Sequence, residues 1–182
     1  MTDLAAHYLE EVDRQLRGYK RMADGAIAQI TDDDLFRTLD PESNSIAILI
    51  KHLAGNMRSR FSDFLTSDGE KPNRHRDQEF VLGESTRDGL LRSWEQGWEI
   101  VFTTLASLGP QDLLRTVTVR GQPHTVLQAF NRQLAHYADH VGQIVLLAKH
   151  YRGPDWKTLS VPKGQSETYK PETDKTSHKP NA

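Results

Sequence analysis

The chain has 182 residues and a formal net charge of -2 at pH 7, with 23 basic and 25 acidic side chains interspersed along it. That length suits one domain with a sizeable core, and the balance of charge predicts no general affinity for nucleic acid or for an anionic membrane. There is no cysteine, which excludes disulfides, thiolate metal ligands and a cysteine nucleophile. No apolar run approaches the roughly 20 residues that span a bilayer, and the N-terminus lacks a signal-peptide core, so we expect a cytoplasmic protein.

The predicted elements begin with a long amphipathic helix over residues 4–30, in which apolar side chains recur at alternating steps of three and four. Thr31 and the three aspartates after it can cap a second, short helical turn. Residues 43–45 then offer N-cap oxygens for a helix whose apolar stripe runs over residues 46–64. His52 lies beside this stripe.

Residues 66–83 form a long charged connection with two helix breakers, Gly69 and Pro72. Most such segments are solvated linkers, and that is the reading we expect first. The alternative is a lid or a loop that contacts substrate, because long loops in compact domains are often functional.

A third long helix follows, with N-cap oxygens available at residues 85–86. Trp94 and Trp98 share its apolar face, and this spacing is typical of core residues rather than of a stack on a cofactor. The β-branched residues within 115–125 predict a small β-hairpin that reverses at residues 121–123.

The last predicted helix covers residues 125–151 and carries the most distinctive spacing in the chain. His136 and His140 are one turn apart and point the same way, so they could grip one divalent metal ion with a third ligand from another helix. The spacing alone is weak, because two histidines fall four apart by chance on the order of a third of the time in such a chain. Beyond this helix, we expect the domain to end at residue 158 and residues 159–182 to form a disordered tail.

The two halves of the chain resemble one another. Residues 34–39 match residues 112–117 closely, and each segment follows a long helix and precedes one that bears histidine. This pattern indicates an all-α four-helix bundle, with the small β-hairpin before the last helix, in which His52 could face His136 and His140. All three histidines lie at the flank of their apolar stripes, where a side chain either lines a cleft or is half exposed.

Three stretches of sequence resemble a known family. They are residues 45–57, which contain His-Leu-Ala-Gly-Asn-Met, residues 63–72, which contain Asp-Gly-Glu-Lys-Pro, and residues 136–144. Together they resemble the DinB/YfiT-like superfamily, and within it a branch of small bacterial proteins of unknown function that carries the first two motifs. The resemblance runs over most of the chain, from Tyr8 to Tyr151.

This resemblance implies a four-helix bundle, often connected up-down-down-up, that holds a divalent metal through three histidines. One comes from the second helix and matches His52, and two come from the fourth and match His136 and His140. Characterised relatives include metal-dependent transferases and isomerases that use low-molecular-weight thiols such as bacillithiol or mycothiol. Three imidazoles accept several transition metals, of which we expect zinc or nickel first and iron as a further option.

The chemistry at such a site stays open between three readings. A bound thiol would lose its proton near neutral pH and attack an electrophile, which suits a chain without cysteine. A bound water would instead become a hydroxide nucleophile and give a hydrolase. The third reading is a non-enzymatic protein, either metal-binding or a homodimer that serves interaction. The zinc-protease motif His-Glu-x-x-His is absent from the sequence.

No residue stands out in the sequence as a general base. Asn56, Gln133 and Gln143 could orient ligands or substrate, or be surface amides. We interpret the remaining histidines as surface or packing residues: His7, His75, His124, His150 and His178. His75, in the charged connection, is the first of these that could instead have a functional role.

Overall fold

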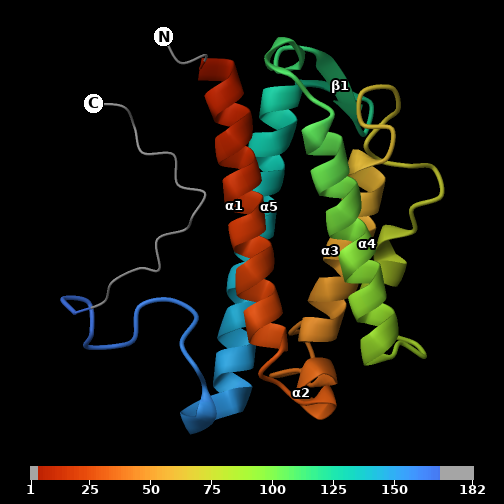
Figure 1. Cartoon of the computed structure of the whole chain (residues 1–182). Coiled ribbons are helices and arrows are strands. Elements are labelled where there is room, and N and C mark those ends of the chain that lie inside the picture. The colour runs from red at the N-terminus through yellow and green to blue at the C-terminus, as the bar shows by residue number, and fades with distance from the viewer. Residues whose placement is uncertain (1–3, 169–182) are drawn as a thin grey trace.

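The computed structural model describes residues 4–168. Four main helices pack together, α1 (Leu4–Ile27), α3 (Ile46–Phe61), α4 (Arg87–Ala106) and α5 (Val126–Arg152). In Figure 1, α1 and α5 run in one direction and α3 and α4 in the other, which is the predicted up-down-down-up connection. α3 packs against both α4 and α5, and α1 closes the bundle against α5 and α4.

The helices begin where the sequence supplies a capping oxygen. Thr31 forms a capping box with Asp34 at the start of the short helix α2 (Asp32–Phe36). Ser45 and Thr86 cap α3 and α4, and Thr125 caps α5, each by accepting a hydrogen bond from the backbone N–H three residues later. The caps at Thr31, Ser45 and Thr86 are among those that the sequence predicted, whereas the start of α5 was expected near residue 125 from apolar periodicity. Short 3₁₀ turns complete the helical elements: η1 (Arg76–Phe80), η2 (Pro110–Asp112) and η3 (Gly153–Asp155).

The predicted hairpin is present, but it reverses at a different place. β1 (Thr116–Val119) pairs antiparallel with β2 (Gln122–Thr125), and Val119 lies opposite Gln122. The turn therefore consists of Arg120 and Gly121, whose φ angles are 55° and 71°. The expected reversal at residues 121–123 was wrong, because Gln122 and Pro123 are already paired in β2 and the positive φ angles of a type I′ turn fall on Arg120 and Gly121.

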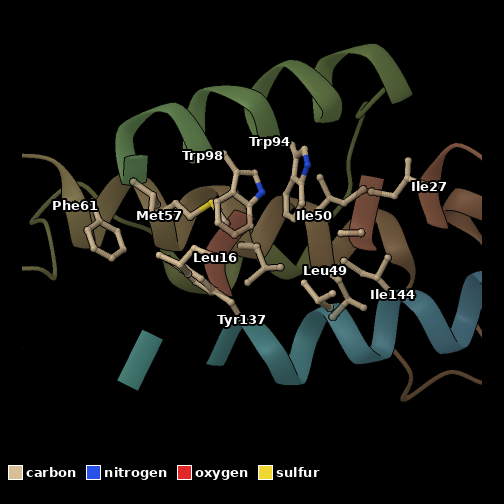
Figure 2. Close-up of a cluster of buried hydrophobic side chains, with 14 of the residues drawn as sticks. Leu16, Ile27, Leu49, Ile50, Met57, Phe61, Trp94, Trp98, Tyr137 and Ile144 are labelled. Atoms are coloured by element: carbon tan, nitrogen blue, oxygen red, sulfur yellow. The ribbon is translucent and has the colours of Figure 1, made fainter. Parts of the chain in front are cut away.

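The core lies between the four main helices (Figure 2), with Trp94 and Trp98 at its centre. The two tryptophans are 0% and 1% exposed, and their rings meet edge to face with centroids 5.5 Å apart. Leu16 from α1 and Tyr137 from α5 complete the layer beside Trp98 (Figure 2), and Tyr137 lies 5.7 Å from the Trp98 ring. The interpretation of both tryptophans as core residues is confirmed.

The long connection between α3 and α4 is not a solvated linker. Because α3 and α4 are parallel, the chain has to return along the length of the bundle, and η1 packs against α3 on the way. The Asp68 carboxylate accepts hydrogen bonds from the backbone N–H groups of Arg120 and Gly121, at 2.8 Å each, and the Gly69 N–H donates to the carbonyl of Thr118. These bonds tie the first part of the connection to the hairpin turn, while many residues from 72 to 83 stay exposed.

Beyond α5 the chain returns to α1. Gln29 exchanges two hydrogen bonds with the backbone of Lys157, and Leu159 packs over Gly25. Of the tail predicted for residues 159–182, residues 169–182 lie outside the described part of the chain. Within residues 4–168, none of the helices has the length and apolar character needed to cross a membrane.

Candidate metal centre

Two helices present matching faces to one another. On α3, His52, Asn56 and Arg60 follow at steps of four residues, and on α5 the series is Arg132, His136 and His140. Residues spaced by four lie one above the other on an α-helix, about 6 Å apart along its axis. Because α3 and α5 are antiparallel neighbours, the histidines of both helices meet at one level and the arginines lie at the same end of the bundle.

The three predicted histidines come together. Each offers one ring nitrogen, and these three nitrogens lie within 4.8 Å of one another. Nε2 of His52 is 3.2 Å from Nε2 of His136. Two imidazole nitrogens bound to one tetrahedral zinc ion would be about 3.3 Å apart, given metal–nitrogen bonds of about 2.0–2.1 Å. The arrangement therefore fits a divalent ion held by three imidazoles, and it is the only such His, Asp or Glu group within residues 4–168.

Glu79 fixes the orientation of His52, and sequence reasoning did not identify it. Its Oε2 lies 2.8 Å from Nδ1 of His52, and both residues are buried. A carboxylate only accepts hydrogen bonds, so Nδ1 carries the proton and Nε2 keeps the lone pair that faces His136. Both Glu79 oxygens also accept from the guanidinium of Arg74, at 2.8 and 2.9 Å. Carboxylates placed in this way hold a ligating histidine in its ring orientation and raise its basicity.

Gly55 makes the approach of Glu79 possible. This residue lies on α3 between His52 and Asn56, and a Cβ there would overlap the Glu79 carboxylate, with its Cδ at 2.8 Å. Any larger side chain would therefore push η1 away from the helix. The glycine in the His-Leu-Ala-Gly-Asn-Met stretch has a packing reason in this structure, because the buried carboxylate occupies the space of its side chain.

The electrostatics favour neutral imidazoles and an ionised Glu79. Burial, with the neighbouring His140 and His52 acting in the same direction, lowers the pKa of His136 to about 3. Burial also lowers the pKa of His140, with His52 adding to the effect. Burial alone would raise the pKa of Glu79, but its hydrogen bonds to His52 and Arg74 outweigh this and lower it. Metal binding requires neutral imidazoles, and the lowered pKa values of His136 and His140 keep these two rings neutral at neutral pH.

The triad opens into a cavity of about 480 Å³. Five arginines line it together with the histidines, and Asn56, Phe80 and Gln133 supply the rest of the wall. No Asp or Glu lines it among the described residues. All three histidines at the flanks of their stripes therefore line the cavity, with His52 buried and His136 and His140 partly buried.

The three amides that sequence reasoning singled out have different surroundings. Asn56 is buried beside the triad and accepts a hydrogen bond from the Tyr137 hydroxyl at 3.1 Å. Gln133 is 5% exposed and lines the cavity, and its Oε1 has no partner among the described residues. Gln143 donates to Asp139 at 3.0 Å and does not line the cavity.

The other histidines within residues 4–168 do not join the triad. His75 is exposed and lies outside the cavity wall, so a functional role for it at the triad is not supported by the structure. His7 and His150 are exposed, and the Nδ1 of His124 approaches the carbonyl of Gln122 in the hairpin. His178 lies outside the described residues.

The fold and the histidine triad together define the class of protein, a four-helix bundle with a three-histidine site that could hold a metal ion. The chain belongs to the family described as Protein of unknown function (DUF1572), which matches residues 3–165 and is DinB/YfiT-like. The resemblance drawn from the sequence is confirmed at the level of this superfamily. No curated protein and no solved structure matches the chain.

Proposed function

We propose that this protein is a divalent-metal-dependent transferase that joins a low-molecular-weight thiol to small electrophiles, with zinc or nickel as the metal. The observation that carries the proposal is the convergence of His52, His136 and His140 at one end of an open cavity, with His52 oriented by the buried Glu79. Three neutral imidazoles leave a divalent ion its full charge and at least one open position.

A divalent ion at this site would lower the pKa of a thiol placed beside it, so that sulfur attacks as the thiolate near neutral pH. In the overall reaction the S–H bond breaks, a bond forms from sulfur to the electrophilic carbon, and the leaving group departs with its electron pair. The chain contributes no cysteine, so the sulfur comes from the thiol substrate.

The surroundings of the triad support a thiol more than a water molecule as the nucleophile. The carboxylate nearest the triad is Glu79, and hydrogen bonds from Arg74 and His52 occupy both its oxygens and lower its pKa. A lowered pKa makes Glu79 a weak base. An ordinary thiol has a pKa of about 8.5 and needs only a modest shift to ionise, so its proton passes to solvent through the open cavity without a general base.

We further propose that the two sequence stretches seen in the resemblance mark a branch of the family with this arrangement. One stretch supplies His52, Gly55 and Asn56 to the site. The other, residues 68–71, fastens the connection to the hairpin and to Arg60, whose guanidinium donates to the Gly69 carbonyl and to Glu70. Both stretches thus support the walls of one cavity.

The experiment is a conjugation screen with the full chain loaded with zinc or nickel, a set of low-molecular-weight thiols and monochlorobimane as the electrophile. We expect metal-dependent formation of the thioether, lost about 100-fold or more in His140→Ala and unchanged in His150→Ala, which alters an exposed histidine on the same helix. Equal rates with metal-free and metal-loaded protein would contradict the proposal. Metal-dependent hydrolysis of ester substrates in the absence of any thiol would replace it with the hydrolase reading.

A further inference from the structure

The wall of the cavity beside the triad is strongly basic. Five guanidinium groups line it, and they come from four separate parts of the chain: α3, the connection to α4, the hairpin turn and α5. The residues are Arg60, Arg74, Arg76, Arg120 and Arg132. Such a concentration is unexpected in a chain with a net charge of -2.

Two of these arginines serve the structure. Arg74 is 5% exposed and pairs with both Glu79 and Glu70. Arg60, 6% exposed, pairs with Glu70 at 2.9 Å and donates to the carbonyl of Gly69. Arginines paired in this way hold the wall together and have little capacity left for a ligand, although Nε of Arg60 has no partner among the described residues.

The other three are Arg76, Arg120 and Arg132, and of these only Arg120 forms an ion pair within residues 4–168. Arg120 is half exposed and shares Glu70 with Arg60 and Arg74. Arg76 and Arg132 are exposed and form no ion pair within residues 4–168. Among the described residues, ion pairs to the five guanidinium groups come from two carboxylates, Glu70 and Glu79. Even with the nearby Asp68, this part of the chain leaves two of the five positive charges uncompensated.

The fold fixes where these cations lie. The two backbone N–H groups of the hairpin turn bind Asp68, which sets the position of Arg120 over the cavity. The ring centroids of Phe80 and His52 are 5.0 Å apart. The guanidinium carbon of Arg76 lies over the Phe80 ring, 5.2 Å from its centroid. Arg132 is one helical turn from His136 on the same face of α5, about 6 Å away along the axis. The cations therefore lie within the length of a small molecule from the triad.

We propose that this cavity binds an anionic group of the substrate, a carboxylate or a phosphate, through Arg76, Arg120 and Arg132, while the reacting atom lies at the histidine triad. The guanidinium fork matches the geometry of both anions and binds either with two parallel hydrogen bonds. Gln133, whose buried Oε1 faces no donor among the described residues, would accept a hydrogen bond from the same molecule. This inference deepens the proposed function and rests on it, because it names the chemical class of substrate for that site.

The test measures binding of two probe anions, inorganic phosphate and malonate, to the full chain by calorimetry at pH 8 and low ionic strength. Metal-free protein is used so that the arginines alone are examined. The variant is Arg76→Ala/Arg132→Ala, which removes two exposed side chains without ion pairs. The control is Arg21→Ala/Arg152→Ala, which removes the same charge from exposed positions outside the cavity.

We expect one of the two anions to bind with one equivalent, at least tenfold more weakly in the cavity variant and within about twofold of wild type in the control. The anion that binds more tightly identifies the carboxylate or the phosphate. No binding of either anion, or equal weakening in both double variants, would overturn the inference. Metal loading of the triad is measured separately. If the triad binds metal but the cavity binds neither anion, the inference fails and the proposed function is unaffected. Anion binding by a protein whose triad takes up no metal would support the cavity as an anion site and contradict the proposed function.

Discussion

The core around Trp98 and the cavity beside His52 both take side chains from α3 and α5. They differ in how many buried polar atoms lack a hydrogen-bond partner. Five buried side-chain polar atoms lack a hydrogen-bond partner among the described residues. One belongs to the core, Nε1 of Trp98, and the other four belong to residues that line the cavity: Arg60, Gln133, His136 and His140. An unpaired buried polar atom costs about 1–3 kcal/mol, so the residues of the cavity wall carry more of this cost than the core does.

The comparison teaches that stability and ligand binding are separated along the same two helices. The faces of α3 and α5 that carry Leu49, Ile50, Tyr137 and Ile144 enter the core. The adjoining faces, with His52, Asn56 and His136, line the cavity. Changes in the core should therefore reduce the free energy of unfolding, while changes in the cavity should reduce ligand affinity with smaller effects on folding.

The largest effect is expected from Trp98→Ala. This side chain is 1% exposed and contacts the rings of Trp94, Phe102 and Tyr137. Its removal should lower the free energy of unfolding by about 3–5 kcal/mol, measured by urea denaturation. Trp156→Ala, at the partly exposed end of η3, is the matched control and should cost much less. Equal costs at the two positions would contradict the location of the core.

Glu79→Gln should mainly affect metal affinity. The amide keeps an acceptor for Nδ1 of His52 but loses the negative charge that strengthens the imidazole and pairs with Arg74. We expect zinc to bind about 10- to 100-fold more weakly in competition with a chelator. Glu84→Gln, at an exposed position of the same connection, should leave the affinity unchanged. An unchanged affinity in Glu79→Gln would mean that Glu79 does not orient His52 for a metal.

Gly55→Ala should produce a smaller loss of the same kind. The added methyl group overlaps the Glu79 carboxylate, so η1 has to shift and the bond to His52 weakens. Zinc affinity should fall by about tenfold. Gly142→Ala is the control on α5, where a Cβ meets no atom within 4 Å, and it should raise the free energy of unfolding by about 0.5–1 kcal/mol without changing affinity. An equal change in zinc affinity in Gly55→Ala and Gly142→Ala would mean that the close approach of Glu79 to Gly55 is not what supports metal binding.

The smallest effect concerns stability at acid pH. Burial would raise the pKa of Glu70, but hydrogen bonds from Arg120 and Arg60 outweigh it, so the folded-state pKa lies below the ordinary value of 4.5. A lowered pKa means that the ionised carboxylate stabilises the fold above about pH 4.5 and that this stabilisation is lost as the pH falls through the folded-state value. In urea titrations at several pH values, Glu70→Gln should be less stable at pH 7 and decline less steeply in acid. Glu99→Gln, at an exposed position, should follow wild type.

Much of the fold could be predicted because periodicity and caps act locally. Apolar spacing in the sequence indicated all four main helices, and the side chains of Ser45, Thr86 and Thr125 cap the starts of three of them, α3, α4 and α5. The turn of the hairpin was misplaced, since Arg120 gives no sign in the sequence that it adopts positive φ. That conformation is stabilised by the Asp68 carboxylate from a distant segment.

The site shows the same division between local and distant signals. His136 and His140 could be predicted from their spacing, and His52 from the match between the two halves of the chain and from the resemblance to the family. Glu79 was missed because it lies in a charged connection without apolar periodicity, and only tertiary packing brings it to His52. A signal for the basic cavity was present in the four-residue steps from Arg132 to His136 and His140, which continue the spacing that identified the histidine pair.

The most direct test of the account is elemental analysis of the untagged full chain beside the variant His52→Ala/His136→Ala/His140→Ala, with both proteins shown to be folded by circular dichroism. The account predicts close to one equivalent of a divalent transition metal in the wild type, as purified or after reconstitution with zinc or nickel, and none in the variant. A wild type that takes up no metal under either condition, or a variant that retains it, would contradict the claim that the three histidines form a metal site.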